Sequence, residues 1–309
     1  MRKDTIEALK ELAISFEEKD IQVAYELMSI VRQYKSGVVI NKKLKSYKAI
    51  VEENEKNRER LQNLLDQREI AIIPVGFRCH TKMNFIKKTG IKQQSFPFDS
   101  GFFPPSSVAK VIRSGKVNLE YDDKGTTHNV CVKTERYESP EFGRGIRFES
   151  SSYDDIESSI STADMKSMRR YLDGTFGYYT LDVDKKYVLA HFNWHKLASP
   201  EKSKGISDPA VNLKLATEML NKRILRMFEM AQNAQHTFFV FGEFQEYSFM
   251  QIDDDIYDLG DLTEIESAIR DCVTENFTLI NMSEIESSST LLDIYDSYMS
   301  DGAVKHTAA

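Results

Sequence analysis

The feature that most constrains the fold is the alternation of short apolar runs with helix-like segments. Strand-like runs in the last third are KKYVLAHF, HTFFVFGEF and NFTLINMSE. Between them lie two segments with apolar residues at helical spacing, PAVNLKLATEMLNKRILRMFEMAQN and DLTEIESAIRDCV. An earlier strand, turn and helix is predicted over residues 70–89. Alternating strands and helices form parallel sheets, so we predict an α/β fold whose sheet is mostly parallel with flanking helices.

The first 68 residues have helical periodicity and no strand-like run. Apolar residues recur at helical spacing over residues 4–35, with a break at Lys19 and Asp20, which predicts a helical hairpin. A further helix is predicted over residues 39–66, where few residues are apolar and many opposite charges occur. Such a helix is a solvated face or an interaction arm for a protein partner. We therefore predict a helical N-terminal extension over residues 1–68.

Composition divides the rest of the chain. The α/β domain is predicted over residues 69–290. Inside it, residues 117–186 are richer in Thr, Tyr, Ser and Asp and contain strand-like runs such as HNVCVKTERY, which predicts a less regular insertion. Residues 291–309 are predicted to be a C-terminal tail.

Charge and cysteine content exclude several classes of function. The 309 residues carry a net charge of −7 without a long basic block, which argues against nucleic acid as a partner. No apolar run approaches the roughly 20 residues of a membrane span, and the charged start is unlike a signal peptide, so a cytoplasmic location is expected. The three cysteines form neither a disulfide framework nor a CxxC metal site. No phosphate-cradling glycine loop is present, and we predict no cofactor.

Cys79 is the strongest catalytic candidate in the sequence. It lies in IIPVGFRCHTKMNFIKK, just after a strand-like run and at the start of a predicted helix. The positive end of a helix dipole there favours a thiolate, which attacks acyl carbon atoms. A cysteine in such a place is also often a small buried residue. Cys131 and Cys272 are predicted to be core residues, because they lie inside an apparent strand and an apparent helix.

A nucleophilic cysteine requires a base close in space. His191 and His195 both lie at the carboxyl end of the strand predicted over residues 187–192, where ligands bind in parallel sheets. His191 is equally compatible with the core, and the four-residue spacing of the two is a weak metal signal. Asp99, in FPFDSGF, is positioned to orient a histidine or to cap its own turn. Asn193 and Glu243 are further candidates near the same strand ends.

Three segments together resemble a known family. They are VGFRCHTKMNFIKKTGIKQQSFPFDSGF, YVLAHFNW and LNKRILRMFEMAQNAQHTFFVFGEF, and over residues 70–285 they resemble bacterial papain-like cysteine peptidases associated with surface-polysaccharide gene clusters. The resemblance implies that Cys79 is the nucleophile, that Asp99 belongs to the site and that His191 is the base. The chain differs from that pattern at three positions, Ser100, Phe192 and Gly242, which stand where the family has Trp, Asp and Arg. The second difference keeps His195 as an alternative base.

Three functions remain open from the sequence. One is a papain-like hydrolase whose Cys-His pair attacks the acyl carbon of a peptide, glycan or small-molecule substrate. The strand-to-helix cysteine also resembles acyltransferases of capsule biosynthesis, in which a sugar hydroxyl replaces water as the acceptor. The last is a non-catalytic module that binds a glycan or nucleotide-sugar in the same crevice.

Overall fold

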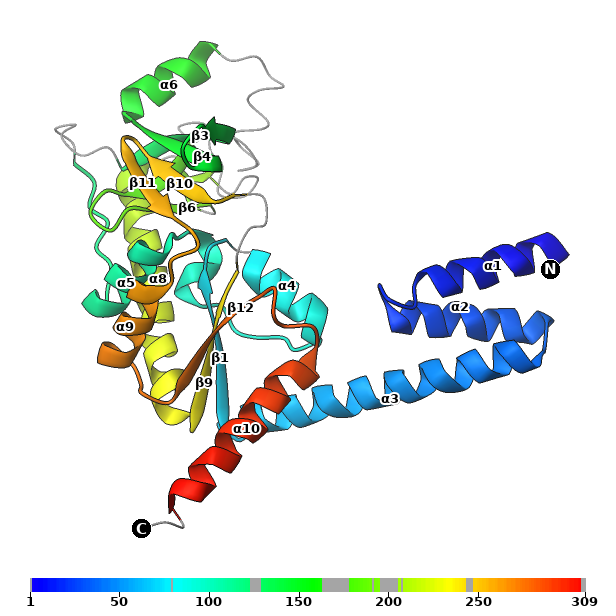
Figure 1. The fold of residues 1–309 in the computed structure, drawn as a ribbon. Coiled ribbons are helices and arrows are strands. Elements are labelled where there is room, and N and C mark those ends of the chain that lie inside the picture. Colours follow the sequence, from blue (N-terminus) through cyan, green and yellow to red (C-terminus); the bar gives the residue numbers. More distant parts are fainter. Residues whose placement is uncertain are drawn as a thin grey trace. The chain divides into compact units, whose positions relative to one another are not determined.

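The protein has a mixed α/β fold, seen in a computed structural model (Figure 1). The structure describes residues 2–78, 80–122, 129–162, 178–190, 192–194, 205–206, 208–242 and 247–306. The chain forms two compact units. One contains residues 1–63 and 286–309, and the other contains residues 64–285.

The first unit is helical in the part of it that the structure describes. Its helices are α1 (Lys3–Ser15), α2 (Ile21–Tyr34), α3 (Val38–Asp66) and α10 (Ser288–His306). Asp20 begins α2 by accepting a hydrogen bond from the Val23 N–H at 3.1 Å, which satisfies one of the free amides of the helix start. The hairpin predicted over residues 4–35 is therefore present as α1 and α2.

The helices of this unit are joined by a small core and by ion pairs. Buried residues on α1, α2 and the first half of α3 form one apolar cluster, to which Ala13, Met28 and Leu44 belong. At the other end of α3, the Arg60 guanidinium donates two hydrogen bonds to the Asp296 carboxylate of α10, at 2.9 and 2.5 Å. The segment predicted as a tail over residues 291–309 is thus helical through His306.

The second unit contains a fully parallel three-stranded sheet. Its strands are β1 (Ile70–Gly76), β9 (His236–Phe241) and β12 (Phe277–Asn281), in the order β1-β9-β12. The register pairs Gly76 with Phe241 and Asn281 with Phe241, so the carboxyl ends of all three strands lie at one edge. The strand, turn and helix predicted over residues 70–89 are confirmed as β1 followed by α4 (His80–Thr89).

The larger sheet is mixed, so the predicted mostly parallel sheet is not confirmed. Its strand order is β11-β10-β4-β3-β5-β6-β2, and β10 with β4 is the parallel pair among six. The strands are β2 (Gly101–Phe102), β3 (Val130–Ser139), β4 (Gly143–Ser151), β5 (Tyr178–Asp182), β6 (Tyr187–Leu189), β10 (Phe249–Ile252) and β11 (Asp255–Asp258). Short turns join β3 to β4, β5 to β6 and β10 to β11, and such turns connect only antiparallel strands.

Other elements connect or cover these sheets. Listed in chain order, they are η1 (Pro97–Ser100), α5 (Pro105–Ser114), α6 (Tyr153–Thr162), the paired strands β7 (Asn193–Trp194) and β8 (Gly205–Ile206), α8 (Pro209–Asn233) and α9 (Thr263–Cys272).

One hydrophobic core joins the two sheets of this unit. Phe102 of β2 lies at the junction, with its ring centroid 5.9 Å from that of Phe77 and 5.1 Å from that of Phe148 on β4. Phe103 stacks on Tyr187 of β6 with the centroids 4.5 Å apart. Because these rings interlock, the end of β1 and the edge of the mixed sheet are held against each other.

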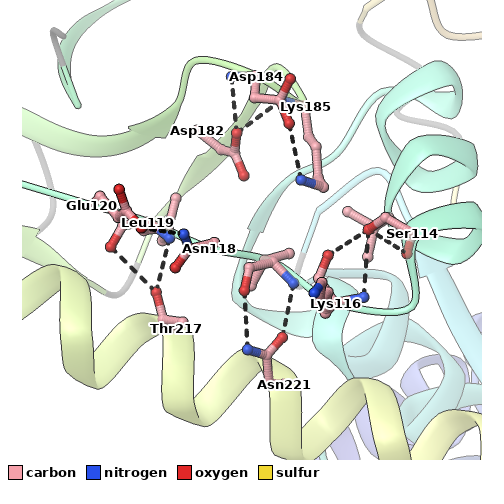
Figure 2. A network of polar contacts seen from close by, with 12 residues as sticks. Ser114, Lys116, Asn118, Leu119, Glu120, Asp182, Asp184, Lys185, Thr217 and Asn221 are labelled. Carbon is pink, nitrogen blue, oxygen red and sulfur yellow. Dashed lines mark hydrogen bonds and ion pairs between the residues drawn. The ribbon is translucent and has the colours of Figure 1, made fainter.

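Helix α8 also fixes the connection between α5 and the insertion. Figure 2 shows Thr217 and Asn221, one helical turn apart, binding an extended segment that runs along the helix. The Asn221 amide accepts from the Val117 N–H at 2.8 Å and donates to the Val117 carbonyl at 3.0 Å, and the Thr217 hydroxyl accepts from the Leu119 N–H at 3.0 Å. These side chains satisfy backbone groups that have no strand partner.

We predict that Gly242→Ala destabilises the chain. A Cβ at Gly242, just after β9, would overlap the side chain of Thr81 on α4, whose hydroxyl donates to the Gly76 carbonyl. The expected loss is about 1–3 kcal/mol of unfolding free energy in urea titrations. Thr81→Ala is the matched variant: combined with Gly242→Ala, it should lose less than the sum of the two single changes. Strict additivity would contradict the contact.

We predict that the buried imidazole of His236 makes the folded chain less stable at acidic pH. It is 1% exposed at the start of β9, its Nε2 lies 2.9 Å from the Thr278 hydroxyl, and burial lowers the pKa of His236 to about 4. The unfolded state, with an imidazole pKa of about 6.5, therefore binds more protons as pH falls from about 6.5 to 4. The unfolding free energy should therefore fall by up to about 3 kcal/mol as the pH is lowered from about 6.5 to 4. His236→Gln should reduce this slope in urea titrations, and an unchanged slope would contradict the assignment.

Candidate functional site

Several residues predicted for the site lie outside the residues that the structure describes. These are Cys79, His191, His195 and Glu243. The residues on both sides of Cys79 and of His191 are described, as are the residues directly before His195 and Glu243, and so is Asp99.

The chain before Cys79 is fixed by backbone hydrogen bonds at the carboxyl edge of the parallel sheet. The Phe77 N–H donates to the Gly242 carbonyl at 3.1 Å, and the Gly242 N–H donates to the Gly76 carbonyl at 2.9 Å. On the other side, the Phe103 N–H donates to the Phe77 carbonyl at 2.9 Å. The end of β1 is thus bound both to β9 and to the segment that carries β2.

Arg78 and His80 lie on either side of Cys79 in the sequence, and Arg78 brings a positive charge to this edge. The Arg78 guanidinium lies over the Phe102 ring, with its Cζ 4.9 Å from the ring centroid. Burial lowers the pKa of His80, and the nearby positive charge of Arg78 lowers that pKa further. The neutral imidazole is therefore favoured at His80. Arg78 was not predicted as part of the site, although it stands next to Cys79 in the sequence.

The chain on both sides of His191 is anchored as well. The Ala190 N–H donates to the Ser100 carbonyl at 2.8 Å. The Phe192 carbonyl accepts hydrogen bonds from the Thr180 hydroxyl and, at 3.4 Å, from the Asn212 amide. The strand before this point is β6 of the mixed sheet, where it pairs antiparallel with β2 and β5, so it does not belong to the parallel sheet in which it was predicted.

Asp99 caps its own turn. Its Oδ2 accepts the Phe96 N–H at 2.8 Å and lies 3.3 Å from the Lys82 ammonium nitrogen. Burial raises the pKa of Asp99, against the opposing effects of the Phe96 N–H, Lys82 and Arg223. Among the described residues, no hydrogen bond is present at Oδ1. Capping the turn, one of the two roles expected for Asp99, is therefore present.

Cations from α4 and α8 hold the loop around Asp99. Lys82 donates to the Gln94 carbonyl at 2.9 Å, and Arg226 donates to the Ser95 carbonyl at 2.8 Å. Arg223 donates to the Ser100 hydroxyl and, at 3.4 Å, to the Phe96 carbonyl. These roles were not predicted; the three-residue spacing of Arg223 and Arg226, which places both on one helix face, was the available signal.

The two other cysteines have different surroundings. Cys131 is buried in β3, as predicted, and burial raises the pKa of its thiol well above the usual value. Cys272, the last residue of α9, is exposed, so the prediction that it is a core residue is wrong. The apolar face of α9 is made by Ile265, Ala268 and Ile269, and Cys272 continues that stripe by its spacing but is exposed as the last residue of the helix.

The described residues contain no group of three His, Cys, Asp or Glu side chains arranged to hold a metal ion. In the same part of the chain, every helix is too short or too polar to cross a membrane.

Comparison with known proteins does not assign the chain to a family. No protein-family model, no curated protein and no solved structure matches it.

We predict that Asp99 stabilises the fold because its carboxylate oxygen accepts a hydrogen bond and faces Lys82. Asp99→Ala removes the acceptor of the Phe96 N–H and leaves Lys82 without its carboxylate, so we expect a loss of about 2–3 kcal/mol in urea titrations. Asp99→Asn keeps an acceptor oxygen and should lose clearly less. Equal losses would show that the hydrogen bond to Phe96 contributes nothing.

Proposed function

We propose that this protein is a thiol-dependent hydrolase or acyl transferase, in which Cys79 attacks an acyl carbon and His191 relays the proton. The proposal includes a peptide, glycan or small-molecule acyl substrate. It also includes a cytoplasmic location, where thiols stay reduced. The charged helix α3 remains a proposed arm for a protein partner.

One observation carries the proposal: the chain on either side of both candidates binds the same short segment. Phe77, two residues before Cys79, bonds to Phe103, and Ala190, directly before His191, bonds to Ser100. Ser100 and Phe103 are three residues apart, so their Cα atoms are separated by at most about 11 Å. Two side chains leaving these anchors can meet within hydrogen-bond reach, which a nucleophile and its base require.

The local charge supports a reactive thiolate at Cys79. Residues 70–98 contain five basic residues and no acidic one, within a chain whose net charge is −7. Arg78 directly precedes Cys79 in the sequence, and α4 begins at His80, directly after it. A guanidinium and the positive end of a helix dipole are therefore adjacent to Cys79 in the sequence. Nearby cations and helix N-termini lower thiol pKa values, and the thiolate is the attacking species.

In the same proposal, Asp99 orients the imidazole of the histidine base. Its neighbour Ser100 accepts the Ala190 N–H, so the carboxylate lies close in sequence to the anchor of the His191 segment. Since Oδ1 has no hydrogen bond among the described residues, it is the oxygen available to orient an imidazole. His195 stays the alternative base.

The proposed chemistry takes two steps. The Cys79 thiolate adds to the acyl carbonyl, a carbon–sulfur bond forms, and the leaving group departs with the proton of the imidazolium. The neutral imidazole then removes a proton from the acceptor as that acceptor attacks the thioester and releases Cys79. Water as acceptor gives hydrolysis, and a sugar hydroxyl gives acyl transfer.

Cys79 should react with iodoacetamide faster than either other cysteine at neutral pH. Cys272 is the control because its thiol is free and exposed, while buried Cys131 should be slowest. Timed labelling followed by peptide mass spectrometry measures the three rates. If Cys79 labels no faster than Cys272, the activated thiolate is excluded.

The base can be assigned with paired variants. His191→Gln should shift the labelling of Cys79 to higher pH and abolish acetyl-enzyme formation with p-nitrophenyl acetate, whereas His195→Gln should leave both close to the original protein. The reverse pattern would make His195 the base. No change in either variant would contradict a Cys-His pair.

A further inference from the structure

We infer that a pocket at the amino-terminal end of β1, here called the β1-start pocket, binds a small zwitterion of the α-amino acid class with an apolar side chain. The pocket lies within the 64–285 unit and has a volume of about 470 Å³. Pockets of this size hold ligands of metabolite size. It is formed by the end of α3, the first residues of β1, Gln94 and the last turns of α8.

Both signs of charge line the β1-start pocket. Arg68 contributes a guanidinium and Glu229 contributes a carboxylate. Both side chains are exposed at the pocket, and within the described residues neither forms an ion pair or a hydrogen bond with the other or with a third group. A ligand that carries a carboxylate and an ammonium group can satisfy both at once, with the planar guanidinium matching the carboxylate.

The backbone at Arg68 is the second observation. Helix α3 ends in a Schellman motif, in which the Glu69 N–H donates to the Leu64 carbonyl at 2.9 Å and the Arg68 N–H donates to the Leu65 carbonyl at 3.1 Å. Arg68 has φ +59° in the left-handed position that glycine usually occupies in this motif. A long cationic side chain is kept at a position where glycine would be more stable, and such departures are characteristic of binding sites.

The apolar residues of the lining indicate the kind of side chain that the ligand carries. Ile70 and Ala71 are buried at the start of β1, and Met230 of α8 is half-buried beside them. Leu65 at the end of α3 also lines the pocket and is half-buried, and an apolar side chain gains by covering the exposed parts of Leu65 and Met230, to which a flexible methionine adapts. Leucine has the carboxylate, the ammonium group and the apolar side chain that match the lining of the β1-start pocket.

This inference does not depend on the proposed function. Ile70 and Gly76 are at opposite ends of β1, six residues and roughly 20 Å apart. The β1-start pocket is thus at the other edge of the parallel sheet from the Cys79 segment, and its ligand is not the acyl substrate.

The test is calorimetric titration of the full chain with L-leucine in the millimolar range. Two fragments serve as controls, 4-methylpentanoate without the amine and isopentylamine without the carboxylate. We expect leucine to bind at least about tenfold more tightly than either fragment, because each fragment leaves one charged partner unsatisfied. Arg68→Gly should weaken leucine binding by about tenfold or more while keeping or raising the melting temperature.

Lys186→Gly is the matched control for Arg68→Gly. Lys186 is also a basic residue in the left-handed region, with φ +60°, but it lies in the turn between β5 and β6. This variant should bind leucine as the original chain does. Absence of binding by leucine, equal binding of either fragment, or unchanged binding in Arg68→Gly would each overturn the inference.

Discussion

The organisation of the site depends on how the 95–103 segment, SFPFDSGFF, is held between the two sheets. Its carbonyl groups accept hydrogen bonds from Arg226, Arg223 and Ala190, and its Phe103 N–H donates to the end of β1. Asp99 closes the turn inside the segment. Because these bonds come from α8, β6 and β1 together, the segment fixes the separation between the parallel sheet and the edge of the mixed sheet. The aromatic contacts of Phe102 and Phe103 fill the space behind it.

This arrangement differs from the simple crevice of a parallel sheet. The thiol candidate follows a strand of the parallel sheet, whereas the histidine candidates follow β6 of the mixed sheet. The 95–103 segment connects the ends of these two strands, because its Phe103 N–H donates to the Phe77 carbonyl and its Ser100 carbonyl accepts from the Ala190 N–H.

Much of the fold was predictable from local patterns. The hairpin over residues 4–35, β1 with α4, and the long helix α8 were predicted from apolar periodicity and from breaks such as Lys19 and Asp20, because those signals are local. The mixed sheet was not predicted. Strand direction depends on the partner that each strand meets, and the strand at Tyr187–Leu189 meets β5 across a short turn, a pairing that its own sequence does not encode.

The candidate site was predictable only in part. The two roles expected for Asp99 came from the FPFDSGF motif, and its cap to Phe96 is the one present in the structure. The loop-holding roles of Arg223 and Arg226 could not be predicted, because they depend on α8 lying against the 95–103 segment, about 125 residues earlier in the chain. The role of Lys82 depends in the same way on how α4 packs against the loop that follows it.

The most direct test of the central claim is a crystal structure of the chain in which the distance from the Cys79 Sγ to each imidazole nitrogen of His191 is measured. The account predicts a separation of about 4 Å or less, or a single water that bridges the two groups. A separation far beyond that reach for both His191 and His195 would contradict it.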